Sequence, residues 1–399
     1  MAGPLAGIKV VEMGLWVAGP SCAAILGDWG AEVIKIEPPS GDPFRGLFAS
    51  LMGAPAELNP PFELDNRGKR SLVLDLANAE SRQAFERLLA SADVFVSNLR
   101  PDGLERLDLG PENVMRRHPR LVYASVSGYG LSGEDRDRAA YDVGAFWARA
   151  GVAHQLVPEG TPPPGIRGGF GDHTTGLAAV GGIMAALYKR ERTGRGELVE
   201  ASLLRTGVYC MGWDLGIQLR FGKLAPTGPR TAAINPAMNS YRAGDGRWFF
   251  LLGLEAERHW PKLVRALEHP ELGEDERCVD ARARRRNAQE IVSMLDRIFA
   301  TRSLPDWAKR FDAADVWWAP VQTPAEVVDD PQAHAIGAFV DVPGRAGEAP
   351  QRAVATPIRF GSTEVGPRAP VPELGEHGRD VLRELGYDEA QIRRLTGGD

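Results

Sequence analysis

Apolar and polar positions in the first half of the chain follow two alternating periodicities. Short apolar runs bounded by Gly, Pro or polar residues are typical of buried strands. They predict strands at 8–12, 32–37, 71–75, 94–97 and 121–127. Helical spacing between them predicts helices at 21–28 and 80–90, the second with Phe85, Leu88 and Leu89 facing inward. Strands that alternate with helices build parallel sheets, so we expect an α/β fold with a doubly wound layer.

A longer helix is predicted in the middle of the chain, after the glycine-rich stretch GGFGD. Its apolar residues recur at helical spacing and predict one buried face, made of Leu177, Val180, Met184 and Leu187. Gly194 marks its expected end.

Glycines inside this predicted helix lower its intrinsic stability by about 1 kcal/mol each relative to alanine. They are Gly176, Gly181 and Gly182. Residues without a side chain are used where two surfaces approach closely. We therefore expect another backbone or a ligand to lie against this helix.

The second half of the chain predicts a strand at 197–201 and a helix at 203–219, followed by a linker that carries Pro and Gly. YRAGDGRWFFLLG then predicts a hairpin that turns at 244–246. Two helical faces follow, one with Trp260, Leu263, Val264 and Leu267 and one with Ile291, Leu295 and Ile298.

The last segment predicts strands near Phe339 and Ile358 and a helix at 379–385. We expect it to pack back on the first part of the chain. The predicted organisation is therefore a large domain begun by 1–220, a linker and smaller α+β domain at 221–330, and a return segment at 331–399.

Composition and charge exclude several functional classes. The 399 residues are 43% hydrophobic and 25% charged, as in ordinary globular proteins. The net charge of −6 argues against a nucleic-acid partner, and the arginines at 282 and 284–286 are expected to form a solvated helix face. There is no apolar run of about 18 residues and no signal-peptide pattern. The three cysteines show no metal-ligand spacing, so we expect a cytoplasmic protein without a metal or a membrane partner.

One carboxylate, Asp172, is placed at the predicted start of the long helix. The positive end of a helix dipole favours the ionised form of a carboxylate, and an ionised carboxylate can act as a nucleophile. The alternative is that Asp172 only caps the helix. His173 follows directly, and it either orients Asp172, transfers a proton or faces solvent.

Several segments along the chain match one family in order. They are PLAGIKVVEMG, VAGPSCAAILGDWGAEVIKIEPPSGDPFR, GKRSLVLDL, ADVFVSNLRPDGLERL, YASVSGYG, GGFGDHTTG with GIMAALYKRERTGRGELVEASL, and APVQTPAEVVDDPQ. Together they resemble the family III CoA-transferases, the group of formyl-CoA transferase and carnitine CoA-transferase. The resemblance implies a Rossmann-like large domain, a small domain and an interlocked homodimer.

The resemblance also implies the chemistry. The residue that matches Asp172 is the catalytic nucleophile of that family. The implied activity moves CoA between a thioester donor and a free carboxylic acid, through an aspartyl anhydride and an aspartyl-CoA thioester. CoA and acyl-CoA are then substrates, and no tightly bound cofactor is expected.

Contacts with CoA are implied on loops that follow the large-domain strands. Carried over by position, they fall at Val17, Ala18, Leu74, Ala77, Asn98, Leu99, Arg100, Arg106 and Asp142. Arg100 and Arg106 have the chemistry that suits a phosphate. The alternative is that these two arginines are ordinary surface residues.

The substrate pocket is implied at Trp16, Tyr141, His173 and Gly253. Val17 stands where formyl-CoA transferase has an active-site glutamine, and LLGLEAE, with the single Gly253, stands near its tetraglycine lid. These differences argue against a formyl or oxalyl group and favour a larger, more apolar acid. Trp16 faces either this pocket or the core.

Two other functions remain open. A 2-methylacyl-CoA racemase of the same superfamily uses a histidine in a GHD motif, but Tyr141 stands at that position in AAYDVGAF, and a tyrosine of pKa about 10 replaces it poorly. A noncatalytic CoA-binding paralogue would need no nucleophile at Asp172. Cys22 is either a low-pKa thiol at a helix start or, as we favour, a small packing residue.

Overall fold

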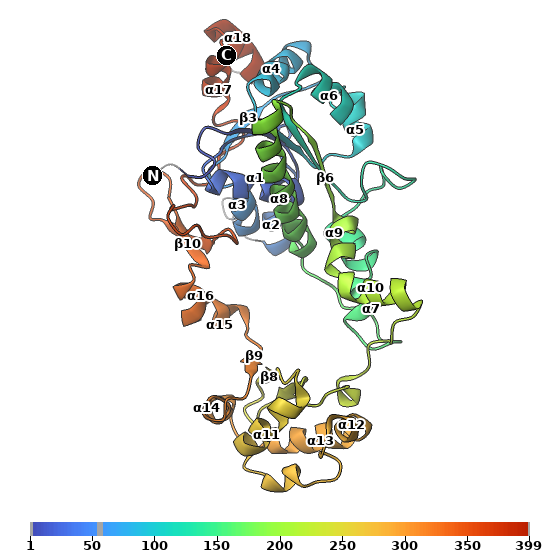
Figure 1. Cartoon of the computed structure of the whole chain (residues 1–399). Helices are drawn as coiled ribbons and strands as arrows, with labels where there is room; N and C mark the ends of the chain where they lie inside the picture. Colours follow the sequence, from blue (N-terminus) through green and yellow to red (C-terminus); the bar gives the residue numbers. More distant parts are fainter. Residues whose placement is uncertain (1–2, 54–58, 398–399) are drawn as a thin grey trace. The chain divides into compact units, whose positions relative to one another are not determined.

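The computed structural model describes residues 3–53 and 59–397. The chain divides into two compact units (Figure 1). The larger unit comprises 1–153, 165–224 and 332–399, and the smaller unit comprises 154–164 and 225–331.

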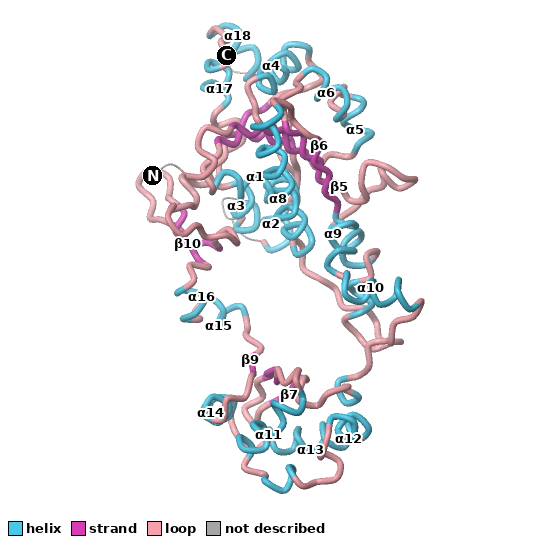
Figure 2. Tube along the Cα trace, in the orientation of Figure 1, coloured by secondary structure: helices cyan, strands magenta, loops and turns pink. Residues whose placement is uncertain are grey.

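A six-stranded parallel sheet forms the centre of the larger unit (Figure 2). Its strands are β1 (Lys9–Met13), β2 (Glu32–Glu37), β3 (Arg70–Val73), β4 (Val94–Ser97), β5 (Val122–Ser127) and β6 (Leu198–Ser202). They lie in the order β3-β2-β1-β4-β5-β6, and every pair is parallel. In this doubly wound order the direction of winding reverses between β1 and β4. The predicted α/β fold with a parallel sheet is confirmed.

Successive strand residues point into two separate cores. Val10 and Val94 belong to one core, whereas Val11 and Phe95 belong to the other. Because side chains alternate across a strand and both faces are covered, the strands read as continuous apolar runs. That pattern is why their positions could be predicted closely.

Helices cover both faces of the sheet (Figure 1). One core is closed by α1 (Ala18–Asp28) and α8 (Phe170–Thr193). The other core is closed by α4 (Ala79–Ala90), α5 (Pro101–Arg106), α6 (Pro111–Arg117), α17 (Gly378–Glu384) and α18 (Glu389–Thr396). Outside these layers lie α2 (Phe44–Met52), α3 (Pro60–Asn66), a π-helical segment (Val143–Ala148), α7 (Val152–Gln155), α9 (Leu203–Cys210), α10 (Gly212–Phe221), α16 (Pro331–Ala335), β10 (Phe339–Val342) and β11 (Gln351–Val354).

The helices α1 and α8 pack closely against each other. A Cβ atom at Gly176 would lie 2.3 Å from Ser21 Oγ and 3.0 Å from the carbonyl oxygen of Ala18. At Gly182 it would lie 2.5 Å from Val199 Cγ1. The expected approach of another backbone is confirmed at Gly176, whereas the neighbour at Gly182 is a side chain and Gly181 has no neighbour of this kind within 4 Å among the described residues.

The smaller unit joins a short antiparallel sheet to a group of helices. The sheet contains β7 (Ser240–Arg242), β8 (Trp248–Leu251) and β9 (Trp318–Pro320). The helices are α11 (Ala256–Leu267), α12 (Ala281–Arg286), α13 (Ala288–Phe299), α14 (Leu304–Ala313) and α15 (Pro324–Val328), with 3₁₀ turns at Arg230–Ala232 and Pro270–Gly273. The predicted hairpin and both predicted helical faces are confirmed.

Several local predictions were wrong. The helix predicted at 203–219 is two helices, because the chain leaves helical geometry at Met211. No strand forms at Ile358; the partner of β10 is β11. Leu177 on α8 is 36% exposed, and Ala179 and Ile183 take its expected place in the core. At Leu177 the apolar pattern was present, but tertiary packing selected a neighbouring face of the helix.

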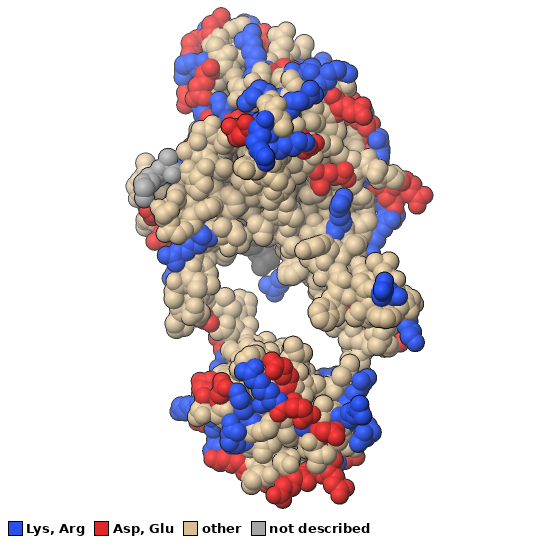
Figure 3. Space-filling view, viewed as in Figure 1, with Lys and Arg blue, Asp and Glu red and all other residues tan. Residues whose placement is uncertain are grey.

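The predicted solvated arginine face is correct in part. Arg284 on α12 is only 2% exposed, with its guanidinium lying over the Trp260 ring and 2.9 Å from Glu257. Across the smaller unit, cationic and anionic side chains are interspersed on the face seen in Figure 3. Within residues 3–53 and 59–397, no helix is both long and apolar enough to cross a membrane.

Candidate active site

Asp172 lies in the first turn of α8, which begins at Phe170. The cap position is occupied by Gly169 at φ +99°, so Asp172 is not the capping residue. Within the described residues, its carboxylate accepts no hydrogen bond. The half-buried carboxylate is therefore available to a reacting group.

A second carboxylate, Asp142, lies beside this turn. It directly precedes the π-helical segment, is 4% exposed, and accepts a hydrogen bond from the Gly171 backbone N–H at 3.0 Å through Oδ2. Its other oxygen, Oδ1, has no hydrogen-bond partner among the described residues. A Cβ atom at Gly171 would lie 2.4 Å from that oxygen, so only glycine fits there.

The electrostatic environment of Asp172 differs from the expectation. Burial, and secondly the negative charge of Asp142, raise the pKa of Asp172 to about 7. His173 acts in the opposite direction and lowers the pKa. Desolvation and the like charge of Asp142 therefore oppose the ionised form that the position at the helix start favours.

His173 pairs with a buried carboxylate from a distant part of the chain. Its Nε2 lies 2.9 Å from Oδ1 of Asp65, on α3. The Asp65 side chain is only 3% exposed, whereas that of His173 is 44% exposed. Burial lowers the pKa of His173, but the Asp65 carboxylate, with Asp172 and Asp142, raises it above its ordinary value overall. No local pattern in the sequence indicates this pair, because its members are 108 residues apart.

Beneath the site lies a group of buried charges that we call the Glu12 network: Glu12, Lys35, Asp42 and Lys69. Lys35 Nζ lies 2.9 Å from Glu12 Oε1 and 3.0 Å from Asp42 Oδ2, and Lys69 Nζ lies 2.6 Å from Glu12 Oε2. All four are at most 2% exposed. Charged residues inside the apolar strands KVVEM and EVIKIE were the available signal, and sequence reasoning did not use it.

The network holds the loop after β1, where Trp16 has φ +64°. The Trp16 backbone N–H donates to Asp42 Oδ1 at 3.2 Å. Its half-buried ring lies edge-on to the Tyr141 ring at 5.7 Å and 6.1 Å from that of Phe44. Tyr141 is 61% exposed. Trp16 thus forms an aromatic wall with Phe44 and Tyr141, and Tyr141 directly precedes Asp142.

The implied CoA contacts differ in their surroundings. Val17 and Ala18 lie at the start of α1. Asn98 follows β4 and lies close to Gly19, where an added Cβ atom would be 3.0 Å from Asn98 Cγ. The Leu74 side chain is buried in the core, and Leu99 packs against that core. A CoA contact at Leu74 would therefore involve its backbone.

The remaining implied contacts in these loops are exposed. They are Ala77, Arg100 and Arg106. Arg106 pairs with Asp102 at 2.8 Å, and Arg100 approaches the same carboxylate at 4.0 Å. Arg106 also lines a cavity of about 650 Å³ together with Arg82 and Arg87.

Gly253 and Cys22 were also singled out from the sequence. Gly253 belongs to the smaller unit, where a Cβ atom would lie 2.8 Å from the carbonyl oxygen of Ala237. Cys22 is fully buried, and burial raises the pKa of its thiol to about 12. The low-pKa thiol is excluded, and the packing role is confirmed.

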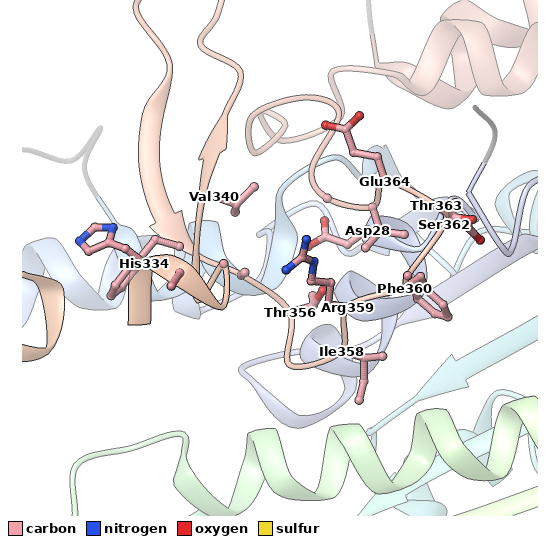
Figure 4. A pocket seen from close by; sticks show the side chains of 17 residues that line it. Asp28, His334, Val340, Thr356, Ile358, Arg359, Phe360, Ser362, Thr363 and Glu364 are labelled. Atoms are coloured by element: carbon pink, nitrogen blue, oxygen red, sulfur yellow. The ribbon is translucent and has the colours of Figure 1, made fainter. Parts of the chain in front are cut away.

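Another cavity of the larger unit, of about 660 Å³, is shown in Figure 4. It is lined by Asp28, by His334 and by residues of the segment 355–366. The predicted site residues all lie within the described part of the chain, and none of them lines this cavity. It is a feature separate from the Asp172 site.

The chain is similar to known proteins over nearly its whole length. (R)-2-hydroxy-4-methylpentanoate CoA-transferase of Clostridioides difficile is 34% identical over 393 residues, covering 98% of this chain and 98% of that protein. Cinnamoyl-CoA:phenyllactate CoA-transferase of Clostridium sporogenes is 32% identical over 403 residues, covering 98% and 95%. The crystal structure of a CAIB/BAIF family protein from Brucella suis superposes with a TM-score of 0.84 at 30% identity, covering 96% of this chain and 100% of that chain.

The match is not confined to one part of the sequence. The model of CoA-transferase family III matches residues 5–378, which include the whole smaller unit, most of the larger unit and every predicted site residue. The relatives are named as CoA-transferases, which supports an enzyme acting on CoA-linked substrates. The chain therefore belongs to CoA-transferase family III.

Proposed function

We propose that this protein transfers CoA from an acyl-CoA thioester to a free carboxylic acid, with Asp172 as the covalent carrier. The observation that carries this proposal is the Asp172 carboxylate itself. It is presented on the first turn of α8 with no hydrogen-bond partner among the described residues. A carboxylate that neither caps the helix nor forms an ion pair is suited to nucleophilic attack.

The first half of the reaction loads CoA onto the enzyme. An Asp172 carboxylate oxygen attacks the thioester carbon of the donor, the C–S bond breaks, and CoA leaves as a thiolate with the bonding electron pair. This gives a mixed anhydride. The thiolate then attacks the Asp172 carbonyl carbon, the anhydride C–O bond breaks, and the donor acid leaves as a carboxylate. The product is an aspartyl-CoA thioester.

The second half repeats these steps in reverse order with the acceptor. A carboxylate oxygen of the acceptor attacks the aspartyl thioester carbon and expels the CoA thiolate, which forms a second anhydride. The thiolate attacks the acceptor's carbonyl carbon and releases the Asp172 carboxylate. Each attack develops an oxyanion that needs hydrogen-bond donors. Both partners enter and leave as anions, so no step requires a net proton.

The acyl-CoA is proposed to lie over the carboxyl ends of β1, β3 and β4, where a doubly wound sheet binds its ligands. Arg106, on the wall of the 650 Å³ cavity, supplies a guanidinium suited to a phosphate of CoA. Arg100 is the second candidate, because its side chain is 58% exposed and approaches the same carboxylate, that of Asp102. An arginine that leaves Asp102 to bind a phosphate exchanges one charge-assisted hydrogen bond for another.

For the acceptor we propose a carboxylic acid with a branched or aryl side chain. Trp16 and Tyr141 form an aromatic wall, and Val17 offers no polar group for a small polar acid. The two relatives named above act, by their names, on 2-hydroxy-4-methylpentanoate and on phenyllactate. Both acids combine a carboxylate with a bulky apolar end, which matches such a wall.

The protein is also proposed to form an interlocked homodimer. The family resemblance suggests it, and exposed apolar side chains support it. Tyr209 is 85%, Trp213 83% and Leu219 87% exposed on α9 and α10, and no residue of α10 is buried within the chain. Apolar surface of this kind marks a protein interface.

The proposed carrier is tested by trapping. Incubate the protein with an acyl-CoA donor, add hydroxylamine, and map the modified peptide by mass spectrometry. A hydroxamate at Asp172 is expected, together with loss of transfer and retained CoA binding in Asp172→Ala. Modification of another residue, with Asp172→Ala still active, would contradict the proposal.

The racemase alternative is tested separately. Incubate the protein with a chiral 2-methylacyl-CoA in deuterium oxide and follow exchange at the alpha carbon. Because Tyr141 replaces the histidine that a racemase uses, exchange far slower than CoA transfer is expected. Exchange as fast as transfer would make the protein a racemase.

A further inference from the structure

His173 and Asp65 form an ion pair beside the nucleophile that the transfer chemistry leaves without a role. Carboxylates and thiolates exchange in every step of the proposed reaction, so no general acid or base is required. A histidine next to Asp172 is therefore not needed as a proton donor. It can contribute as a fixed cation.

The geometry of the pair favours that role. Asp65 is almost fully buried, and His173 is the hydrogen-bond partner of its carboxylate, at 2.9 Å. A buried carboxylate is costly unless it is paired. The imidazole is also seated against Gly169, where a Cβ atom would lie 3.2 Å from its Cε1. The imidazole is thus fixed by its contact with Asp65, on the residue that directly follows Asp172.

Asp172 needs such a neighbour. Its surroundings are otherwise anionic or desolvating, with Asp142 on the π-helical segment and Asp65 on α3. The buried ammonium of Lys69 interacts with Asp65 and is already shared with Glu12. Among the charged groups of the described residues that act on Asp172, His173 is the one that favours its ionised form.

We propose that His173, anchored by Asp65, is a positioning residue that keeps a cation beside Asp172 and thereby keeps the nucleophile anionic. The inference rests on the proposed function, because it assumes that Asp172 attacks as a carboxylate. If so, the acidic midpoint of the pH–rate profile depends on the His173–Asp65 pair. Loss of the cation leaves Asp172 with the negative charges of Asp142 and Asp65.

The test is the pH dependence of kcat/KM in three variants. His173→Gln keeps a hydrogen-bonding group at Asp65 but removes the cation, so the acidic midpoint should rise by about one pH unit. Activity should fall about tenfold at about pH 6 and stay within twofold of wild type at about pH 9. His173→Lys restores a cation and should return the midpoint toward that of wild type. The matched control is His118→Gln. His118 Nε2 lies 3.0 Å from Glu86 Oε2, and this pair is away from Asp172, so the substitution should leave the profile unchanged.

A double variant protects the test against misfolding. Asp65→Asn with His173→Gln removes the pair as a neutral unit and leaves no buried carboxylate unpaired. Its midpoint should still rise, because His173 affects Asp172 more than Asp65 does. A His173→Gln profile that superposes on wild type, or a double variant without a shift, overturns the inference.

Trapping separates this inference from the function itself. Hydroxylamine should mark Asp172 in His173→Gln at about pH 9, where the carboxylate is ionised with or without the cation. An unshifted profile with Asp172 still marked rejects the role of His173 and leaves the transfer mechanism standing. A mark on a different residue of the wild-type protein rejects the mechanism, whatever the profile.

Discussion

Asn98 is bonded through its side chain to both backbone polar groups of Leu15. Its Nδ2 donates to the Leu15 carbonyl oxygen at 2.7 Å, and its Oδ1 accepts from the Leu15 N–H at 2.9 Å. The side-chain amide of one residue after β4 thus provides hydrogen-bond partners for both backbone groups of Leu15, in the loop that follows β1. Asn98 fixes the loop that carries Trp16 and Val17.

Asn98→Ala should therefore loosen that loop. Two backbone groups of Leu15 lose their partners, which should lower the free energy of unfolding by about 1–3 kcal/mol and raise KM for acyl-CoA. Chemical denaturation and steady-state kinetics measure the two effects. Asn113→Ala, which removes a surface hydrogen bond to Asp108, is the control and should change neither. An unchanged KM in Asn98→Ala would show that the loop does not position CoA.

The crossing of α1 and α8 predicts opposite effects of one substitution at two glycines. Gly176→Ala places a methyl group 2.3 Å from Ser21 Oγ, so it should destabilise the protein by about 1–3 kcal/mol. Gly181→Ala meets no such neighbour within 4 Å and should stabilise it by up to about 1 kcal/mol through helix propensity. Thermal denaturation of both variants gives the sign. Equal effects would contradict the observed packing.

The raised pKa of Asp172 predicts a pH-dependent stability difference. Its folded-state pKa of about 7 lies above its ordinary value of 3.8, so its ionisation destabilises the fold as pH rises. Asp172→Asn should be more stable than wild type by about 1–3 kcal/mol above about pH 8, and the difference should vanish below about pH 4. Urea denaturation at several pH values measures it. A difference that grows toward acidic pH would have the wrong sign.

The proposed interlocked dimer predicts slow subunit exchange. Threaded chains separate only by substantial unfolding, so dissociation should follow the unfolding rate and not dilution. Mix two differently tagged dimers at low concentration and look for mixed dimers by native mass spectrometry. None should form within hours. Mixed dimers within minutes, or a monomer in light scattering, would exclude interlocking.

The sheet was predictable because its strands are buried on both faces. The predicted bounds of β2 and β4 agree with the structure, since continuous apolar runs leave little freedom of register. The helices were less certain. The pattern at Leu177 fits two neighbouring faces, and only packing against α1 decides which face is buried.

The chemistry at Asp172 was predictable only in part. The position of Asp172 at a helix start is a local property and was predicted correctly. Its raised pKa depends on Asp142 and on desolvation, which are set by tertiary structure. The partner of His173 lies on a separate helix, and nothing in the sequence around Asp65 distinguishes it from a surface carboxylate.

The missing side chain at Gly176 has a mechanical consequence. With no Cβ atom at the crossing, α1 and α8 lie in backbone contact, and neither can slide past the other without a collision. Val17, at the start of α1, and Asp172, at the start of α8, are therefore held in a fixed position relative to each other. Any motion that admits substrate must come from other segments, such as the Pro- and Gly-rich stretch before Gly169. The segments that position Val17 and Asp172 are thus different from the segments that would move to admit substrate.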